Sequence, residues 1–301
     1  MSRLRALAAR SSGLLAAALV LSIPAARGGQ DAARPAGPVV RLSYRSLQPG
    51  EPVLVALGTE GTVRSASVTF LGQTAELRPA PGAGGLLAFV GIDVETKPGL
   101  HTLTVRIRKP GGLVEVVRKD LEVAAREFPS TKLRFKPEYV TPPASVAERI
   151  RREAELVALA MSVVTPEWLG DGPFEPPHPA ESWKNFGQRR LNNDVLQSLH
   201  TGLDVRVPHG EPVRASNAGT VAMASDLYFA GKTVIVDHGL GVFSTYGHMS
   251  ELLVKRGEAV KKGQTVGLCG TTGRSTGPHL HWAFKVLGAR VDPDAMLRLP
   301  I

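Results

Sequence analysis

The spacing of glycine and proline constrains the fold of this chain more than any other feature. The chain has 301 residues, of which 32 are glycine and 23 are proline, and they divide it into short apolar runs. Short apolar runs between turn residues are typical of β-strands, whereas an amphipathic helix needs a longer uninterrupted segment. The sequence therefore predicts a mainly β protein.

The N-terminal half contains a first set of such runs. They cover residues 53–57, 66–70, 86–92, 103–107 and 114–123. Pro-Gly and Gly-Gly dipeptides separate several of them, as at the turns of antiparallel sheets. We predict an immunoglobulin-like β-sandwich over residues 38–125. His101 stands alone in this region, and we expect it to be a surface strand residue.

One amphipathic helix is predicted in the linker, residues 126–170. Ser145 and Glu148 have the spacing of a capping box, which would start the helix. Apolar residues then recur at helical intervals: Ile150, Ala154, Val157, Met161 and Val164. We expect this stripe to pack between the two domains.

The C-terminal part, residues 171–301, is again rich in short strands. Apolar runs at 221–223, 233–236, 242–246 and 265–268 are separated by closely spaced glycines. This pattern predicts a compact antiparallel β domain whose loops carry the polar residues.

The N-terminus resembles a targeting segment. Arg3, Arg5 and Arg10 precede an apolar run at 13–23, and small residues follow at 24–28. The run is shorter than the roughly 20 residues that a membrane-spanning helix needs. We predict a secretory signal over residues 1–28, no transmembrane span in the mature chain, and export to the periplasm or cell envelope. An uncleaved anchor is the alternative.

Net charge and cysteine content exclude two classes. The formal charge of +9 falls to +5 when residues 1–28 are removed, so we expect no nucleic-acid partner. The single cysteine, Cys269, rules out an internal disulfide framework. It lies in an apolar run, where a small buried residue is favoured over a thiol nucleophile.

Histidines supply the candidate chemistry. His279 and His281 are two apart, so in an extended segment their rings lie on one face with Cα atoms about 7 Å apart. One ring could then bind a metal while the other acts on a water beside it. The alternative is that both simply line a strand.

Further candidate ligands lie upstream. His200 and Asp204 are four apart, with Gly202 permitting a bend. Together with His281 they would leave one position open, as in a catalytic zinc site, whereas structural zinc sites commonly have four ligands. His248, at the end of a predicted strand, is a candidate for proton transfer. His238 lies in a turn and could be structural.

Several motifs in order resemble the lysostaphin/LytM-type zinc endopeptidases, over residues 185–295. They are His200-x-x-x-Asp204, Tyr246-Gly247-His248, the run 257–267, and Gly273-Arg-Ser-Thr-Gly-Pro-His-Leu-His281. The resemblance implies that residues 171–301 form a zinc metallopeptidase domain.

The resemblance also implies a site and a substrate. One zinc ion would be bound by His200, Asp204 and His281, with His248 and His279 as catalytic histidines. A zinc-activated water would hydrolyse peptide bonds in peptidoglycan stem peptides or cross-links.

Two other readings of the C-terminal domain remain, and the role of the sandwich is a separate question. Some relatives lack ligands and act as non-catalytic wall-binding modules or activators of other hydrolases, but this sequence keeps all five positions. The run 254–267 resembles the hairpin of a biotinyl or lipoyl carrier, although its lysines are better explained as solvated turn residues. The sandwich could position the enzyme on the wall or bind an envelope protein partner.

Overall fold

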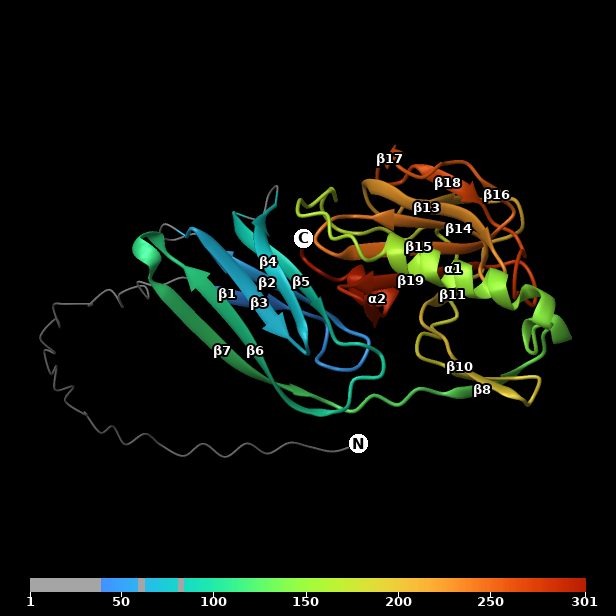
Figure 1. Cartoon of the computed structure of the whole chain (residues 1–301), viewed down its shortest axis with the longest axis horizontal. Coiled ribbons are helices and arrows are strands. Elements are labelled where there is room, and N and C mark those ends of the chain that lie inside the picture. The colour runs from blue at the N-terminus through green and yellow to red at the C-terminus, as the bar shows by residue number, and fades with distance from the viewer. Residues whose placement is uncertain (1–38, 59–62, 81–83) are drawn as a thin grey trace, which may run out of the picture. The chain divides into compact units, whose positions relative to one another are not determined.

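The structure is a computed structural model that describes residues 39–58, 63–80 and 84–301. The predicted signal, residues 1–28, lies outside this range. The first seven strands are β1 (Val40–Ser43), β2 (Pro52–Gly58), β3 (Ser65–Phe70), β4 (Gln73–Pro79), β5 (Gly85–Gly91), β6 (Gly99–Arg108) and β7 (Val114–Val123), with a short 3-10 turn η1 (Pro110–Gly112) before β7 (Figure 1).

These seven strands are all antiparallel and follow the order β1-β2-β5-β4-β3-β6-β7. The two halves of the path are joined only where β4 meets β5, at two residue pairs. Buried side chains from both halves form one core, among them Val55, Val90, Phe70 and Val105. The predicted mainly β architecture is confirmed, while the immunoglobulin-like assignment stays a prediction.

The later elements begin with the linker and its helix and end with the last sheet. They are β8 (Ser130–Leu133), η2 (Pro137–Tyr139), η3 (Ala144–Val146), α1 (Ala147–Ala160), β9 (Arg189–Asn192), β10 (Leu196–Leu199), β11 (Leu203–Val205), β12 (Pro212–Arg214), β13 (Gly219–Leu227), β14 (Gly231–Asp237), β15 (Val242–Met249), β16 (Glu251–Leu252), β17 (Ala259–Val260), β18 (Thr265–Leu268), β19 (Leu280–Val286), β20 (Ala289–Val291) and α2 (Pro293–Met296).

Helix α1 forms, but not with the predicted cap. Its first turn follows Val146, whose side chain cannot cap it, and Ser145 lies in the preceding 3-10 turn. Glu148 instead pairs with Arg151 one turn on. The capping-box prediction was therefore wrong, because the 3-10 turn moves the helix start past the serine.

The apolar stripe of α1 packs on the C-terminal sheet. Val157, Ala160 and Met161 contact a cluster on β13, β14 and β15: Met223, Leu227, Ile235 and Phe243. Ala154 and Val164 are exposed. The helix therefore covers one face of this sheet, as Figure 1 shows. The prediction that its apolar stripe packs between the two domains was wrong, because the stripe packs on the C-terminal sheet.

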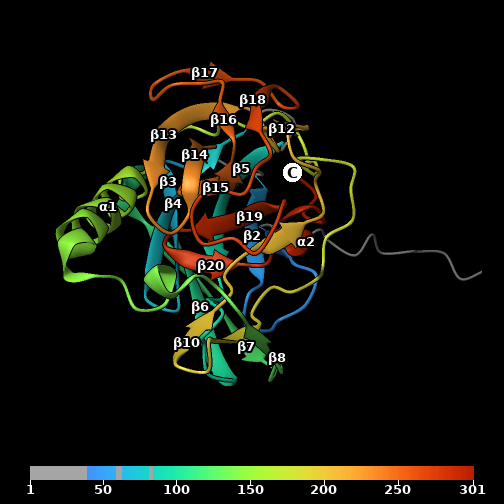
Figure 2. The ribbon, with the colours of Figure 1, turned by 90° about the vertical axis from the view of Figure 1, so that its right-hand side faces the viewer.

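The main C-terminal sheet has the order β11-β19-β15-β14-β13-β17, with β20 beside β19 (Figure 2). Strand β19 alternates strictly, so that Leu280, Trp282, Phe284 and Val286 are buried in the core. Alternation sends the side chain of His281 to the opposite face. A smaller sheet, β12-β18-β16, completes the domain.

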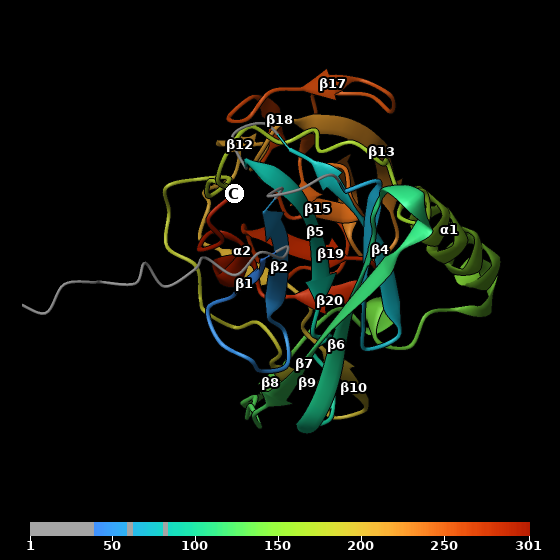
Figure 3. The same cartoon turned by 90° about the vertical axis from the view of Figure 1, so that its left-hand side faces the viewer.

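Part of the predicted linker forms a strand. Strand β8 pairs in parallel with β9, and β9 pairs with β10 (Figure 3). The β9–β10 turn has Asn193 and Asp194 at positive φ, the conformation of a tight hairpin. Asn193 then exchanges hydrogen bonds with the backbone of Phe135, which ties the linker to this hairpin.

Residues 37–301 form a single compact unit. The sandwich and the C-terminal domain meet at a cluster of charged residues: Arg45, Glu51, Arg126 and Asp292. Arg290 also pairs with Asp93. Within the described residues, no helix is long and apolar enough to span a membrane.

Candidate metal centre

Strand pairing assembles the first half of the site. Asp204 on β11 lies directly opposite His281 on β19. His200 reaches the same place because the chain turns tightly at Gly202. A Cβ at Gly202 would lie 2.5 Å from the carbonyl oxygen of Trp282 and 2.8 Å from Cε1 of His281. Only glycine fits this close approach.

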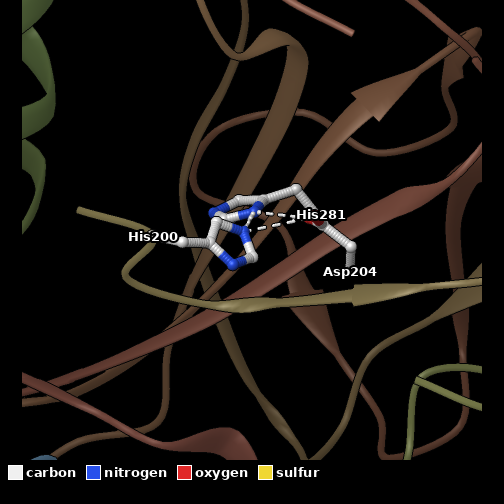
Figure 4. A group of neighbouring side chains, drawn as sticks. All are labelled: His200, Asp204 and His281. Carbon is white, nitrogen blue, oxygen red and sulfur yellow. Dashed lines mark hydrogen bonds and ion pairs between the residues drawn. The ribbon is translucent and has the colours of Figure 1, made fainter. Parts of the chain in front are cut away.

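The three side chains converge on one another (Figure 4). His200 Nε2 is 3.0 Å from Asp204 Oδ1 and 3.0 Å from His281 Nδ1, and His281 Nδ1 is 3.2 Å from Asp204 Oδ1. Zinc–ligand bonds of 2.0–2.1 Å in tetrahedral geometry put neighbouring ligand atoms about 3.3 Å apart. The three atoms therefore match one face of a zinc tetrahedron.

The hydrogen bonds of His200 show which of its ring nitrogens faces the other two candidate ligands. Nδ1 of His200 lies 2.9 Å from the carbonyl oxygen of Asn185, so this nitrogen must carry the proton and donate. Nε2 of His200 then faces the Asp204 carboxylate and Nδ1 of His281. Burial lowers the pKa of His281, so an extra proton there is disfavoured. A metal ion bound between the three side chains would be coordinated by Nε2 of His200, Nδ1 of His281 and Oδ1 of Asp204.

The carboxylate of Asp204 is held by two side chains that sequence reasoning missed. Arg190 donates to Asp204 Oδ2 at 2.6 Å, and Asn185 Nδ2 donates to the same oxygen at 3.0 Å. Burial alone would raise the pKa of Asp204, but the His200 and His281 rings hold it well below its ordinary value. The side chain is therefore an anion with Oδ1 left free for a metal.

Asn185 also accepts from the backbone N–H of Asp204 at 3.1 Å, so one residue orients two of the candidate ligands. Neither Asn185 nor Arg190 shows a metal-ligand spacing to His200. The one available signal was that both lie inside the segment that resembles the peptidase family.

His248 stands beside this cluster at the end of β15. Its ring centroid lies 4.8 Å from that of His279 and 6.0 Å from that of His281. Its φ is +62°, which is unfavourable for a residue with a side chain and is typical of functional positions. Nδ1 donates to the carbonyl of Thr272 at 2.8 Å, which leaves Nε2 as an acceptor. Burial lowers the pKa of His248 to about 3, so the ring is neutral.

His279 has the same arrangement. Nδ1 lies 2.8 Å from the carbonyl of Gly277 and donates to it, and Nε2 lies 3.6 Å from Asp204 Oδ1. Burial lowers the pKa of His279 as well. Trp183 packs against its ring edge-on. Two neutral imidazoles therefore present Nε2 lone pairs near the three candidate ligands.

The other sequence candidates lie elsewhere. His238 is fully buried between the carbonyl of Ala218 and the hydroxyl of Ser244, and burial lowers its pKa to about 4. Cys269 is buried as predicted, its thiol facing the carbonyl of Val207, and burial raises its pKa to about 11. His101 lies on β6 of the sandwich. None of the three contacts the cluster.

Two cavities of about 350 and 170 Å³ border the cluster. Four residues line both: Phe135, Arg190, His248 and Arg274. The larger cavity also reaches Asp204 and His279, and the smaller reaches His200 and His281. A ligand in either cavity would therefore lie beside candidate ligands and a candidate catalytic histidine.

A buried His-Asp-His cluster with neutral imidazoles beside it, on a β domain, has the donor set of a metallopeptidase. The sequence bears this out: residues 198–293 match the profile of Peptidase family M23. The C-terminal domain is thus a Peptidase family M23 domain.

Relatives extend this finding. The peptidoglycan DD-endopeptidase ShyA of Vibrio cholerae is 41% identical over 120 residues, which are 38% of this chain and 28% of ShyA. The DD-carboxypeptidase/endopeptidase Mpg of Neisseria meningitidis is 41% identical over 95 residues, 32% of this chain and 22% of Mpg. The chain therefore matches about a quarter of the length of these relatives.

A solved structure is similar over much more of the chain. A crystal structure from Pseudomonas aeruginosa attributed to peptidase M23 aligns with a TM-score of 0.64 and 28% identity. The alignment covers 84% of this chain and 96% of that chain. The similarity therefore extends beyond the M23 domain, into the part of the chain before it.

Proposed function

We propose that this protein is an exported zinc metalloendopeptidase that hydrolyses peptide bonds in peptidoglycan stem peptides or cross-links. One observation carries the proposal: two imidazole nitrogens and a carboxylate oxygen, from His200, His281 and Asp204, lie 3.0–3.2 Å apart in a buried site. This is the donor set and spacing of a catalytic zinc site, in which three protein ligands leave a fourth position for water.

In the proposed site His200, Asp204 and His281 hold one zinc ion. When bound, zinc lowers the pKa of a water and polarises a carbonyl group. Arg190 and Asn185 keep the Asp204 carboxylate oriented from its other oxygen.

His248 and His279 handle the proton. Each has Nδ1 fixed by a backbone carbonyl, so each offers Nε2 as a base of fixed direction. One Nε2 takes a proton from the attacking water and passes it to the leaving amine. The other ring donates to the developing oxyanion as an imidazolium, which requires that its Nε2 first take up a second proton from solvent. Because both rings leave Nε2 unprotonated and have Nδ1 fixed by a backbone carbonyl, either ring could be the base.

The substrate class rests on the relatives. ShyA is a peptidoglycan DD-endopeptidase that is 41% identical to this chain over 120 residues, and the Peptidase family M23 match, residues 198–293, holds all five site residues. We extend the substrate to this protein, together with a location in the periplasm or envelope. The sandwich then serves to position the domain on the wall or against an envelope protein.

The test is hydrolysis of purified sacculi by the zinc-loaded protein, with the released fragments identified by mass spectrometry. We expect peptides cut within stems or cross-links, and we expect release to stop with a zinc chelator and to return with added zinc. If the folded, zinc-loaded protein releases nothing yet stimulates a second wall hydrolase, the activator reading replaces this one.

A further inference from the structure

Arg274 lies at the rim of the site on a loop of fixed shape. Its backbone N–H donates to the carbonyl of Phe229 at 2.8 Å. The preceding Gly273 has φ +72°, and a Cβ there would come within 2.4 Å of the backbone nitrogen of Gly231. A glycine at this position lets the loop pack closely and so fixes the backbone position of Arg274.

Two aromatic rings hold the guanidinium. Its Cζ lies 5.0 Å from the ring centre of Phe229 and 5.7 Å from that of Phe135, both within cation–π range. Phe135 belongs to the segment after β8, which Asn193 ties to the β9–β10 hairpin. Linker and catalytic domain therefore position this one side chain together.

The charge of Arg274 is not balanced by an acid. Among the ion pairs of the described residues, Arg274 has none, whereas neighbouring Arg190 pairs with Asp204. Burial lowers the pKa of Arg274, and the positive charge of Arg190 lowers it further. A half-buried guanidinium without a carboxylate leaves strong, directional donors unused.

Arg274 lies where a bound substrate would contact it. It lines both cavities beside the metal cluster, and His248 lines both with it. The one acid lining either cavity is Asp204, which already faces Arg190 and the imidazoles. An anion that enters this groove therefore meets Arg274 as its free partner.

We propose that Arg274 binds a free carboxylate of the peptide substrate close to the scissile bond and so selects acidic peptides. The proposal rests on the proposed peptidase function. A carboxylate suits the site because a guanidinium binds it through two parallel hydrogen bonds, and because it restores the charge balance that this half-buried position lacks.

The experiment uses two substrates that differ in charge alone: a cross-linked muropeptide with free carboxyl groups, and the same compound with those groups amidated. The zinc-loaded protein is compared with Arg274→Gln, Arg274→Lys and Arg256→Gln. Arg256 is exposed on a turn, so its replacement controls for net charge. Melting temperature and zinc content are measured for every variant.

We expect the unaltered protein and Arg256→Gln to prefer the free acid by roughly 10- to 100-fold in kcat/KM, as for a charged hydrogen bond. Arg274→Gln loses this preference by becoming slower on the free acid, mainly through KM, while its rate on the amide is unchanged. Arg274→Lys keeps part of the preference.

Equal kcat/KM of the unaltered protein on both substrates would overturn the role of Arg274 and leave the peptidase proposal standing. So would an equal loss on both substrates in Arg274→Gln with zinc and melting temperature retained. Cleavage of neither substrate by the zinc-loaded protein would remove both proposals. Because the first comparison needs no variant, it decides the matter even if Arg274→Gln does not fold.

Discussion

Two buried charged clusters in this protein are built in opposite ways. Between the sandwich and the C-terminal domain, Arg45 and Arg126 both donate to Asp292, at 2.8 and 2.9 Å, and both lie beside Glu51. Two cations face two anions. At the candidate metal centre, two imidazole nitrogens face one carboxylate oxygen.

The difference separates a structural cluster from a binding site. The interdomain cluster is balanced by the chain itself, so it can fix the two domains without any ligand. The metal cluster instead brings two imidazole nitrogens and one carboxylate oxygen together, the donor set of a metal ion, while Arg190 pairs with the other oxygen of the carboxylate. The substitutions that follow alter one cluster, and the measurements test whether the other cluster is affected.

The largest effect is expected for His281→Ala. Loss of one of three ligands should reduce bound zinc below detection and lower hydrolysis by more than about 1,000-fold. Zinc content by atomic absorption and fragment release from sacculi measure both. His101→Ala, on the sandwich, is the control and should change neither. A fully active, zinc-loaded His281→Ala protein would contradict the assigned ligand.

His248→Ala should separate binding from turnover. The ring is proposed to move a proton without holding the metal, so zinc content should stay while kcat falls by roughly 100- to 10,000-fold. Paired measurement of zinc and kcat checks this. Loss of zinc along with kcat would show instead that His248 supports the metal.

Asp292→Asn damages the interdomain cluster. It leaves two half-buried guanidinium groups without their shared carboxylate, which should lower the free energy of unfolding by about 3 kcal/mol. Zinc affinity should stay unchanged, because Asp292 has no contact with the metal ligands. Urea unfolding and a zinc titration measure the two quantities. A matching drop in zinc affinity would show that the clusters are coupled.

Arg190→Met tests the support of Asp204. We expect zinc affinity to fall roughly 10- to 100-fold, because the carboxylate loses the partner that orients it. The measurement is competition with a chelator of known affinity. Arg189→Met is a close control, since the neighbouring side chain is exposed. Equal affinities in the two variants would show that Asn185 alone orients the carboxylate.

The smallest effect concerns pH and the Asp93–Arg290 pair. Burial alone would raise the pKa of Asp93, but hydrogen bonds from Arg290 lower it below its ordinary 3.8. A lowered folded-state pKa stabilises the fold above pH 4 and loses that effect as pH falls through the folded value. We expect Asp93→Asn to cost at most about 1 kcal/mol at pH 7 and progressively less as the pH falls below 4, measured by urea unfolding. A cost that grows toward low pH would refute this.

Local sequence patterns were enough to predict the strands and to find the motif residues. The predicted runs 53–57, 103–107 and 242–246 all lie within strands. The two-residue spacing of His279 and His281 directs both rings to one place, since alternation is a property of extended backbone itself. Mainly β architecture, the family resemblance and buried Cys269 also follow from short stretches of sequence.

Other features depended on segments far apart in the chain. Arg190 supports Asp204 from a different sheet, because it lies on β9 and Asp204 lies on β11. Strand β8 inside the linker pairs with β9. Helix α1 begins after a 3-10 turn, which its capping-box spacing did not reveal. Charged partners such as Arg126 and Asp292 are 166 residues apart. Sequence spacing carries no information about such pairs, because only the packing of the two domains brings them within hydrogen-bonding distance.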